Sequence, residues 1–287
     1  RESSINLFEP VLRIASEEIE NAQLIRPFIK VAGICGPTDA ALGEAELAKK
    51  YGYHLGLVSM GGLAAYSETD LIKRIEEIAE IIPVFGFYLQ PAVGGRVLSY
   101  DFWREFAEIE NVQAIKVAAF NRYQTLDVVR AVCNSSRRNE IALYTGNDDN
   151  IVADLLTPYR FVIDGEKIEK RFVGGLLGHW AVWTKKAVEL FSEIKQCIAN
   201  DSTGIENLLS KGIDITDMNA VIFDAAHSFK GCIAGIHEVL RRQGLMEGVW
   251  CLSPTEKLSP GQSAEIDRIY KFYSQYTDDS FAKKFAV

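Results

Sequence analysis

Residues 84–118 read VFGFYLQPAVGGRVLSYDFWREFAEIENVQAIKVA, and this stretch decides the fold class. Val84–Tyr88 and Val112–Ala118 are short, apolar and rich in β-branched or aromatic residues, which is typical of buried strands. Between them, Ser99 begins a run to Ile109 in which apolar side chains recur at helical spacing. The stretch therefore predicts a strand, a helix and a second strand parallel to the first.

The same alternation continues on both sides of this unit. Further strands are expected at Phe28–Ile34, Leu55–Ser59 and Ile141–Thr145, and helices at Ser4–Glu20, Ala40–Tyr51 with Asp39 as N-cap, Ser67–Ile81, Thr125–Val132 and Ile151–Leu156. Regular alternation with short links predicts a parallel sheet with helices outside it. We expect an α/β protein with a (β/α)8 TIM barrel, and a doubly wound sheet is the second architecture. No Gly-x-Gly-x-x-Gly follows a strand, which weakens the dinucleotide-binding version of that alternative.

Residues 161–172 interrupt the alternation. Asp164-Gly165 stands between two alternating runs and predicts an inserted β-hairpin. The last barrel strand is then expected near Phe172–Leu177, followed by a helix over Lys185–Asn200. From Thr203 onward the pattern predicts helices and loops without further strands.

Lys116 lies inside an apolar strand, in Val112-Gln-Ala-Ile-Lys116-Val-Ala-Ala. A lysine is rarely fully buried, because moving its charge out of water is unfavourable. A buried amine can lower its pKa and become a neutral nucleophile that forms a Schiff base. The alternative is a lysine at a strand end whose amine extends to water.

Composition sets limits on the partners. The chain has 287 residues, of which 48% are hydrophobic and 24% charged, as in ordinary globular proteins. Its net charge of −8 argues against nucleic acid or an anionic membrane as partner. No apolar run reaches membrane-spanning length and no signal peptide opens the chain. The five cysteines are scattered, without a CxxC pair, so we expect reduced thiols and a cytoplasmic protein.

Polar residues and glycines gather where the predicted strands end. These positions are Gly33–Gly36, Ser59–Gly62, Tyr88–Pro91, Lys116 and Thr145–Asp148. In a barrel the carboxyl ends of the strands form the catalytic face. We therefore expect the site there, and Tyr88, one strand before Lys116, is a candidate proton carrier. A core tyrosine with a satisfied hydroxyl is the alternative.

At this point the chain resembles the dihydrodipicolinate synthase / N-acetylneuraminate lyase superfamily of class I, Schiff-base aldolases. Members carry Tyr-Asn-x-Pro-x-x-x-Gly, then a strand ending Gly-Ile-Lys, then Ser-Gly-Asp-Asp. The corresponding stretches are Tyr88-Leu-Gln-Pro-Ala-Val-Gly-Gly95, Ala114-Ile-Lys116 and Thr145-Gly-Asn-Asp148, in the same order and spacing. The resemblance covers roughly residues 4–200.

The resemblance implies a mechanism and site residues. Lys116 would form the imine with a 2-oxo acid such as pyruvate, and Tyr88 would relay the proton. A carbon–carbon bond is then made or broken, so the activity expected is that of a lyase or aldolase without a cofactor or metal. Substrate contacts are expected from Gln90, Arg96, Gly146, Gly174 and Gly175. The partners expected are a small 2-oxo acid and an aldehyde, and the assembly a homodimer or homotetramer.

The chain also departs from the family pattern. Val93 stands where the synthases have an arginine for the second substrate's carboxylate, and Arg96 is displaced from that place. Gly62 and Leu63 occupy the region where the synthases contribute a tyrosine across a subunit contact. The family's Gly-Thr-Thr-Gly-Glu loop is absent. We therefore expect residues 1–200 to supply barrel strands three to eight, with two further βα units upstream, and residues 201–287 to form a helical region.

Several alternatives stay open. A dehydratase of the same superfamily and a non-catalytic ligand-binding barrel are the main rivals. A phosphate-binding barrel enzyme that uses the backbone of Gly174–Gly178 is the third. Asn147-Asp148-Asp149 can bind a metal, although such a run more often caps the next helix. His179 is expected to be a buried, hydrogen-bonded core histidine.

Overall fold

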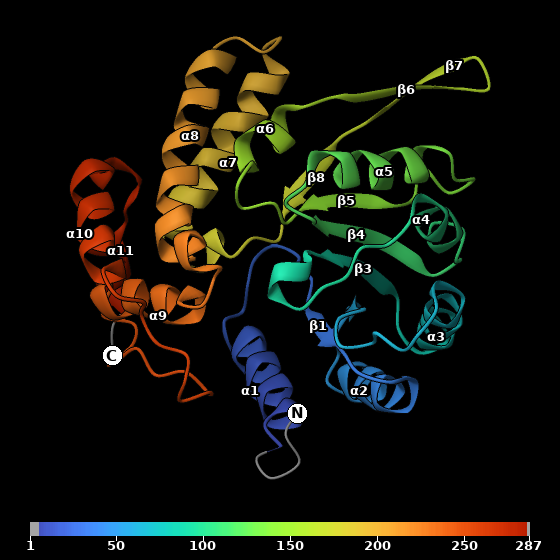
Figure 1. Cartoon of the computed structure of the whole chain (residues 1–287), viewed down its shortest axis with the longest axis horizontal. Coiled ribbons are helices and arrows are strands. Elements are labelled where there is room, and N and C mark those ends of the chain that lie inside the picture. The colour runs from blue at the N-terminus through green and yellow to red at the C-terminus, as the bar shows by residue number, and fades with distance from the viewer. Residues whose placement is uncertain (1–5, 286–287) are drawn as a thin grey trace. The chain divides into compact units, whose positions relative to one another are not determined.

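The computed structural model describes residues 6–285, and its central feature is a parallel sheet of six strands (Figure 1). The strand order is β1-β2-β3-β4-β5-β8, and the register of the first three neighbouring pairs is parallel. The strands are β1 Val31–Ile34, β2 Leu55–Ser59, β3 Val84–Leu89, β4 Val112–Ala118, β5 Ala142–Thr145 and β8 Phe172–Gly175. The predicted α/β class with a parallel sheet is confirmed.

Helices alternate with these strands and then continue to the C-terminal end. They are α1 Phe8–Asn21, α2 Thr38–Lys50, α3 Glu68–Ile81, α4 Tyr100–Phe106, α5 Arg122–Cys133, α6 Ile151–Leu156, α7 Thr184–Ala199, α8 Ile205–Ile222, α9 Cys232–Arg242, α10 Gln262–Phe272 and α11 Asp279–Ala282. Residues 4 and 5 of the first predicted helix lie outside the described residues. After Thr203 the described chain holds helices and no strand, as predicted. Among the described residues, no helix combines the length and the apolar character needed to cross a membrane.

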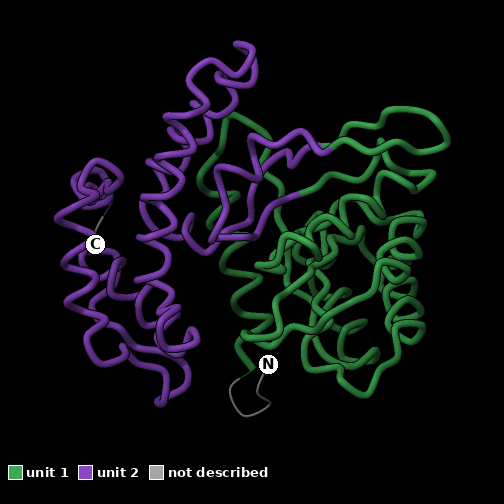
Figure 2. Tube along the Cα trace, turned by 45° about the horizontal axis from the view of Figure 1, so that its top comes forward, with its two compact units in different colours: residues 1–143, 160–170 green, residues 144–159, 171–287 purple. Residues whose placement is uncertain are grey.

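The chain divides into two compact units (Figure 2). Unit 1 runs to Leu143 and includes Arg160–Lys170; it contains β1–β4 and α1–α5. Unit 2 comprises Tyr144–Tyr159 and the residues from Arg171 onward, with β8 and α6–α11. The boundary expected at residue 200 falls inside unit 2, between α7 and α8, so the predicted division at that point stays a prediction.

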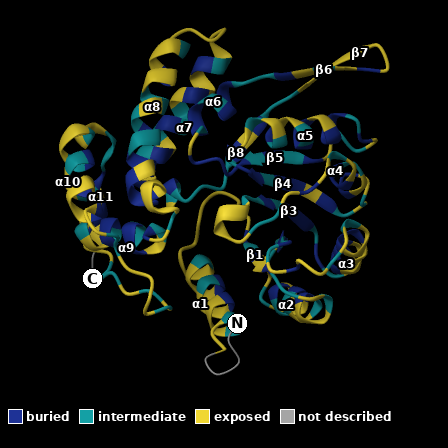
Figure 3. Ribbon diagram, in the orientation of Figure 1, coloured by how far each residue is buried: buried dark blue, intermediate teal, exposed yellow. Residues whose placement is uncertain are grey.

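The sheet of unit 1 has one face covered by helices. On this face Gly86 leaves room for the Phe106 ring of α4, because an added Cβ would lie 2.5 Å from it. Phe102, Trp103 and Phe106 of α4 are all buried and pack edge to face or tilted against one another. Figure 3 shows the corresponding buried stripe along the helices beside β3 and β4.

Local sequence signals explain how the helices begin. Ser67 forms a capping box with Asp70 at the start of α3. Ser99 caps α4 by accepting from the amide of Phe102. The prediction for α2 is wrong by two residues: α2 begins at Thr38 after Pro37, and Asp39 lies in its first turn, where its charge suits the helix dipole.

The predicted hairpin is present. β6 spans Tyr159–Ile163, β7 spans Glu166–Lys170, and the turn residues Asp164 and Gly165 have φ of 50° and 82°. Two successive positive φ values are typical of the type I′ turn that joins antiparallel strands. β8 ends at Gly175, so Leu176 and Leu177 lie beyond the strand predicted to contain them.

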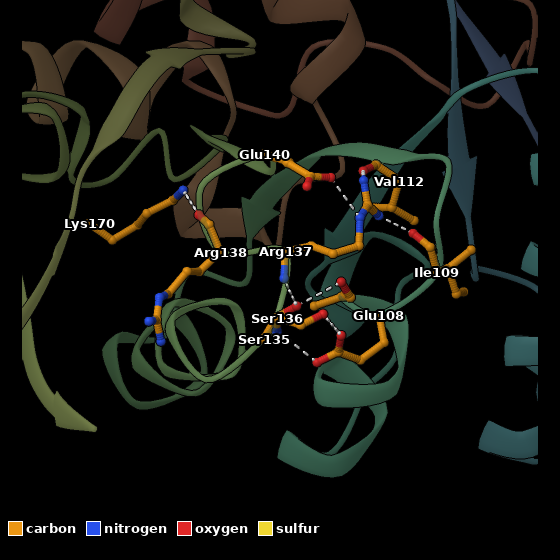
Figure 4. A network of polar contacts seen from close by, with 10 residues as sticks. Glu108, Ile109, Val112, Ser135, Ser136, Arg137, Arg138, Glu140 and Lys170 are labelled. Atoms are coloured by element: carbon orange, nitrogen blue, oxygen red, sulfur yellow. Dashed lines mark hydrogen bonds and ion pairs between the residues drawn. The ribbon is translucent and has the colours of Figure 1, made fainter. Parts of the chain in front are cut away.

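A polar network holds the beginning of β4, the strand that carries Lys116 (Figure 4). Arg137 donates from Nη2 to the carbonyl of Val112 at 2.9 Å and from Nη1 to the carbonyl of Ile109. Its Nε also binds Glu140, at 2.9 Å. Ser136 binds Glu108 with its amide and hydroxyl. The link between α4 and β4 is therefore attached to the turn that follows α5.

Unit 2 has a core of its own, built by the C-terminal helices. Trp183, Met218, Ile222, Val239 and Ile266 are all at most 1% exposed and pack together. They come from four segments: Trp183 precedes α7, Met218 and Ile222 lie in α8, Val239 lies in α9 and Ile266 lies in α10. This core joins α8, α9 and α10 to the residues just before α7.

Candidate functional site

Lys116 lies near the carboxyl end of β4, in register with Phe87 of β3, which is in register with Ser59 of β2. Residues in register on parallel strands point to the same face of a sheet. The Lys116 Nζ lies 4.4 Å from the centroid of the Phe87 ring, within the range of a cation–π contact. The three side chains therefore form one row across the sheet.

This row lies on the more accessible face. Ser59, Phe87 and Lys116 are each partly exposed, whereas Val58, Tyr88 and Val117, which alternate with them, are buried. A parallel sheet enclosed on both faces would bury both sets alike. The Lys116 side chain is therefore partly exposed near the carboxyl end of its strand, whereas Ala114 and Ala118 on the same face are buried.

Tyr88 points to the opposite face. It is in register with Val117, and neighbouring residues of a strand alternate between faces. Its ring packs against Trp103 of α4, with centroids 5.2 Å apart, and its hydroxyl accepts from the amide of Leu98 at 3.3 Å. Burial raises the pKa of Tyr88. The structure does not bring the Tyr88 hydroxyl and the Lys116 amine together, and Phe87 takes the place beside the lysine.

The loop after β3 carries two more of the predicted site residues. Gln90 is partly buried, and its amide donates to the carbonyl of Ala118 at 3.0 Å, which ties the end of β3 to the end of β4. Arg96 donates from Nη1 to the carbonyls of Leu63 and Tyr66, both at 3.0 Å. Arg96 thus joins the loops that follow β2 and β3, a structural contact that the sequence pattern did not indicate.

In unit 2, the motif after β5 is organised by a residue that the sequence analysis did not single out, Asp154 of α6. Its buried carboxylate accepts from the Thr145 hydroxyl at 2.6 Å and from the Asn147 side chain at 2.9 Å. The hydroxyl of Tyr159 reaches the same carboxylate at 3.2 Å. The sequence contains one signal for Asp154: it is the single carboxylate in the apolar run Ile-Val-Ala-Asp-Leu-Leu, and a buried acid requires hydrogen-bond donors around it.

Asp148 binds the segment that follows β8 and does not cap the start of a helix. Its carboxylate accepts from the amides of Gly178 and His179, at 3.3 Å and 2.9 Å. The next helix, α6, begins after Asn150, and no side chain caps it. In the described part of the chain no group of three or more histidines, cysteines or acids is placed to hold a metal ion.

His179 is buried and hydrogen-bonded, as predicted. Its Nδ1 lies 2.6 Å from Oδ1 of Asn219, whose side-chain nitrogen donates to the carbonyl of Asp148. Burial lowers the pKa of His179 to about 4, so the imidazole is neutral at pH 7. Asn219, within a long apolar helix, was missed for lack of a local motif.

The glycines of β8 have a packing role. A Cβ on Gly174 would lie 3.1 Å from the Tyr144 ring, and one on Gly175 would lie 2.5 Å from Leu177. Gly146 is buried. These close approaches explain why small residues occur here, whereas the contact of Gly146, Gly174 and Gly175 with a substrate stays a prediction.

Comparison with known proteins identifies the fold. The structure is similar to dihydrodipicolinate synthase from Oceanobacillus iheyensis (TM-score 0.71, 19% identity, 94% of this chain and 80% of that chain covered). It is similar to a chloride-inhibited synthase from Acinetobacter baumannii complexed with pyruvate (0.71, 19%, 94% and 82%). A third neighbour is N-acetylneuraminate lyase from Fusobacterium nucleatum (0.67, 16%, 94% and 80%). No family model and no curated protein sequence matches the chain. The predicted resemblance is confirmed at the level of the fold, which is that of this superfamily of (β/α) barrels.

Proposed function

We propose that this protein, which has the fold of the dihydrodipicolinate synthase / N-acetylneuraminate lyase superfamily, is a class I aldolase-type lyase acting on a 2-oxo acid such as pyruvate. The observation that supports it most is the position of Lys116, near the carboxyl end of β4, with its side chain partly exposed and against an aromatic ring. The same fold occurs in a synthase complexed with pyruvate.

The proposed chemistry begins with the unprotonated Lys116 amine. Its nitrogen attacks the keto carbon, and the resulting carbinolamine takes up a proton from solvent and loses water to give a protonated imine. This cation draws electrons from the bond two atoms away. Either the methyl carbon gives a proton to solvent, or the carbon–carbon bond breaks, the hydroxyl of the leaving fragment gives its proton to solvent and an aldehyde leaves. An enamine remains in both cases. In the other direction the enamine carbon attacks an aldehyde, and water then releases the product and the free amine.

Phe87 has a defined part in this scheme. Its ring lies 4.4 Å from the lysine nitrogen, and the nitrogen keeps a positive charge in the protonated imine. The negative face of an aromatic ring attracts such a cation, by about 0.5–2 kcal/mol depending on how far the site is desolvated. Phe87 would therefore favour the imine that the lyase reaction requires.

The remaining contacts belong to the proposal. Gln90, Arg96, Gly146, Gly174 and Gly175 are proposed to contact the substrate. A cytoplasmic homodimer or homotetramer is the proposed form of the enzyme, with a 2-oxo acid and an aldehyde as partners. We propose no cofactor, metal or nucleic acid for the reaction.

A second candidate is a barrel that binds a 2-oxo acid without turning it over. The position of Tyr88 favours it, because the phenol lies on the helix-covered face and not beside the lysine. A dehydratase of the same superfamily is a third candidate that shares the imine.

Deuterium exchange tests the proposed function whichever aldehyde is the second substrate. In D2O the wild-type protein is expected to exchange the methyl protons of pyruvate through the enamine, measured by proton NMR. Lys116→Met should abolish the exchange while circular dichroism stays unchanged, and Lys116→Arg controls for the loss of positive charge. Exchange that persists in Lys116→Met would exclude the mechanism, and its absence in the wild type would support the binding barrel.

A further inference from the structure

Unit 2 contains a cavity of about 200 Å³ that none of the residues proposed for the imine chemistry lines. Its walls come from α7, α8 and the short turn Ser274–Tyr276, together with His179. A cavity of this size can hold a small metabolite of up to about ten non-hydrogen atoms.

His179 lines this cavity, and its ring carries a fixed hydrogen-bond acceptor. Asn219 donates with its side-chain nitrogen to the carbonyl of Asp148, so its oxygen faces His179 and the imidazole must donate from Nδ1. Since the imidazole is neutral, the proton on Nδ1 leaves Nε2 with a lone pair. His179 is 3% exposed and lines the cavity. Among the described residues, Asn219 is the hydrogen-bond partner of its ring.

Two opposite-charge pairs lie around the same cavity. Lys186 binds Glu189 at 3.0 Å, and Lys211 of α8 binds Glu193 of α7 at 2.5 Å. All four side chains are between 26% and 47% exposed, so water screens these pairs and they contribute little to stability. Glu189 is also bound by Lys185, so a ligand that carries both charges can exchange most readily with the pair of Lys211 and Glu193.

Gln275 and Tyr276 also line the cavity, and the remaining residues form an apolar wall. Ala187 and Leu190 of α7 and Ile215 of α8 are at most 8% exposed to solvent and form this wall. The cavity thus combines two cations, two anions, one neutral acceptor and a small apolar wall. Its charges balance, which disfavours a ligand with a large net charge of either sign.

We propose that this cavity binds a small zwitterion of the amino-acid type with an aliphatic side chain. The ammonium group donates hydrogen bonds to His179 Nε2 and to the carboxylate of Glu189 or Glu193. The carboxylate of the ligand forms an ion pair with Lys186 or Lys211, and its side chain lies against Leu190 and Ile215. The inference is independent of the reaction at Lys116.

Three matched probes test the charge requirement on the full chain. L-leucine carries both charges, L-leucinamide lacks the carboxylate, and N-acetyl-L-leucine lacks the ammonium. Isothermal titration calorimetry should find saturable binding of leucine, at least about tenfold tighter than that of either analogue. Equal affinities for the three probes, or no leucine binding at about 20 mM, would overturn the proposal.

Variants then locate the binding. Leu190→Phe fills the cavity and Lys211→Met removes one cation from its rim, and each should weaken leucine binding about tenfold or more. Lys195→Met, on α7 but outside the lining, is the matched control and should bind as the wild type does. Should Leu190→Phe fail to fold, Lys211→Met at the exposed rim still decides. Unchanged leucine binding in Lys211→Met would contradict this site, and Lys116→Met should keep leucine binding whatever the outcome at the imine.

Discussion

At the residue scale, the side chain next to Lys116 is the main difference between the expected and the observed site. The motif spacing pairs Tyr88 with Lys116, but the register pairs Phe87 with it. A shift of one residue along a strand moves a side chain to the other face of a sheet. The spacing of residues along the chain does not predict which side chain lies beside Lys116, because that depends on the register of the two strands.

The position of Tyr88 leads to a direct prediction. Tyr88→Phe should leave the rate of pyruvate proton exchange within about threefold, because the hydroxyl faces Leu98 and not the amine. The free energy of unfolding should fall by about 0.5–1.5 kcal/mol, for the hydrogen bond that is lost. A hundredfold slower exchange with unchanged stability would restore the proton relay that the sequence predicted.

Phe87 is expected to matter more for the chemistry. Phe87→Leu keeps an apolar side chain but removes the aromatic ring, so the amount of imine formed with pyruvate should fall about two- to fivefold. Borohydride trapping at several pyruvate concentrations measures this. The matched control is Phe85→Leu, two residues earlier on the same strand, which should leave the affinity for pyruvate unchanged.

His179 makes stability depend on pH. Its pKa is about 4 in the folded chain and near 6.5 when exposed, so the unfolded state binds more protons between these values. The contribution of His179 therefore makes the free energy of unfolding rise with pH from about 4 to 6.5, by up to about 1.4 kcal/mol per unit. Urea unfolding at several pH values measures the slope. His179→Gln should flatten it in this window, and an equally steep slope in the variant would contradict the assignment.

At the scale of elements, the strands and most helix starts could be predicted from sequence because their causes are local. Ser67 with Asp70 and the turn Asp164-Gly165 act within four residues. The contacts of Asp154 and Asn219 join segments up to 71 residues apart. No local pattern specifies the contacts of Asn219, whereas Asp154 stands out in the sequence only as a lone carboxylate in an apolar run.

The network at the start of β4 is a testable element-scale feature. Arg137→Met removes donors to the carbonyls of Ile109 and Val112 and should lower the free energy of unfolding by about 1–3 kcal/mol. Arg138→Met is the control, because that side chain points away from the network (Figure 4). Denaturant midpoints measure both. Equal stability of the two variants would mean that the network contributes nothing.

At the scale of the whole molecule, the alternation of strands and helices suffices to predict the fold class, and the motifs suffice to predict the superfamily whose fold the structure has. The composition of the units could not be predicted, because residues 160–170 belong to unit 1 and the flanking segments to unit 2. The assignment of these segments to the two units depends on tertiary packing rather than on a boundary in the sequence.

The central claim is that Lys116 forms an imine with a 2-oxo acid, and borohydride trapping tests it most directly. The full chain is incubated with pyruvate, reduced with sodium borohydride and measured by intact and peptide mass spectrometry. The account predicts a pyruvate-sized adduct on the peptide that contains Lys116, and none in Lys116→Met. An adduct on another lysine, or no adduct with pyruvate or any other 2-oxo acid of a panel, would contradict it.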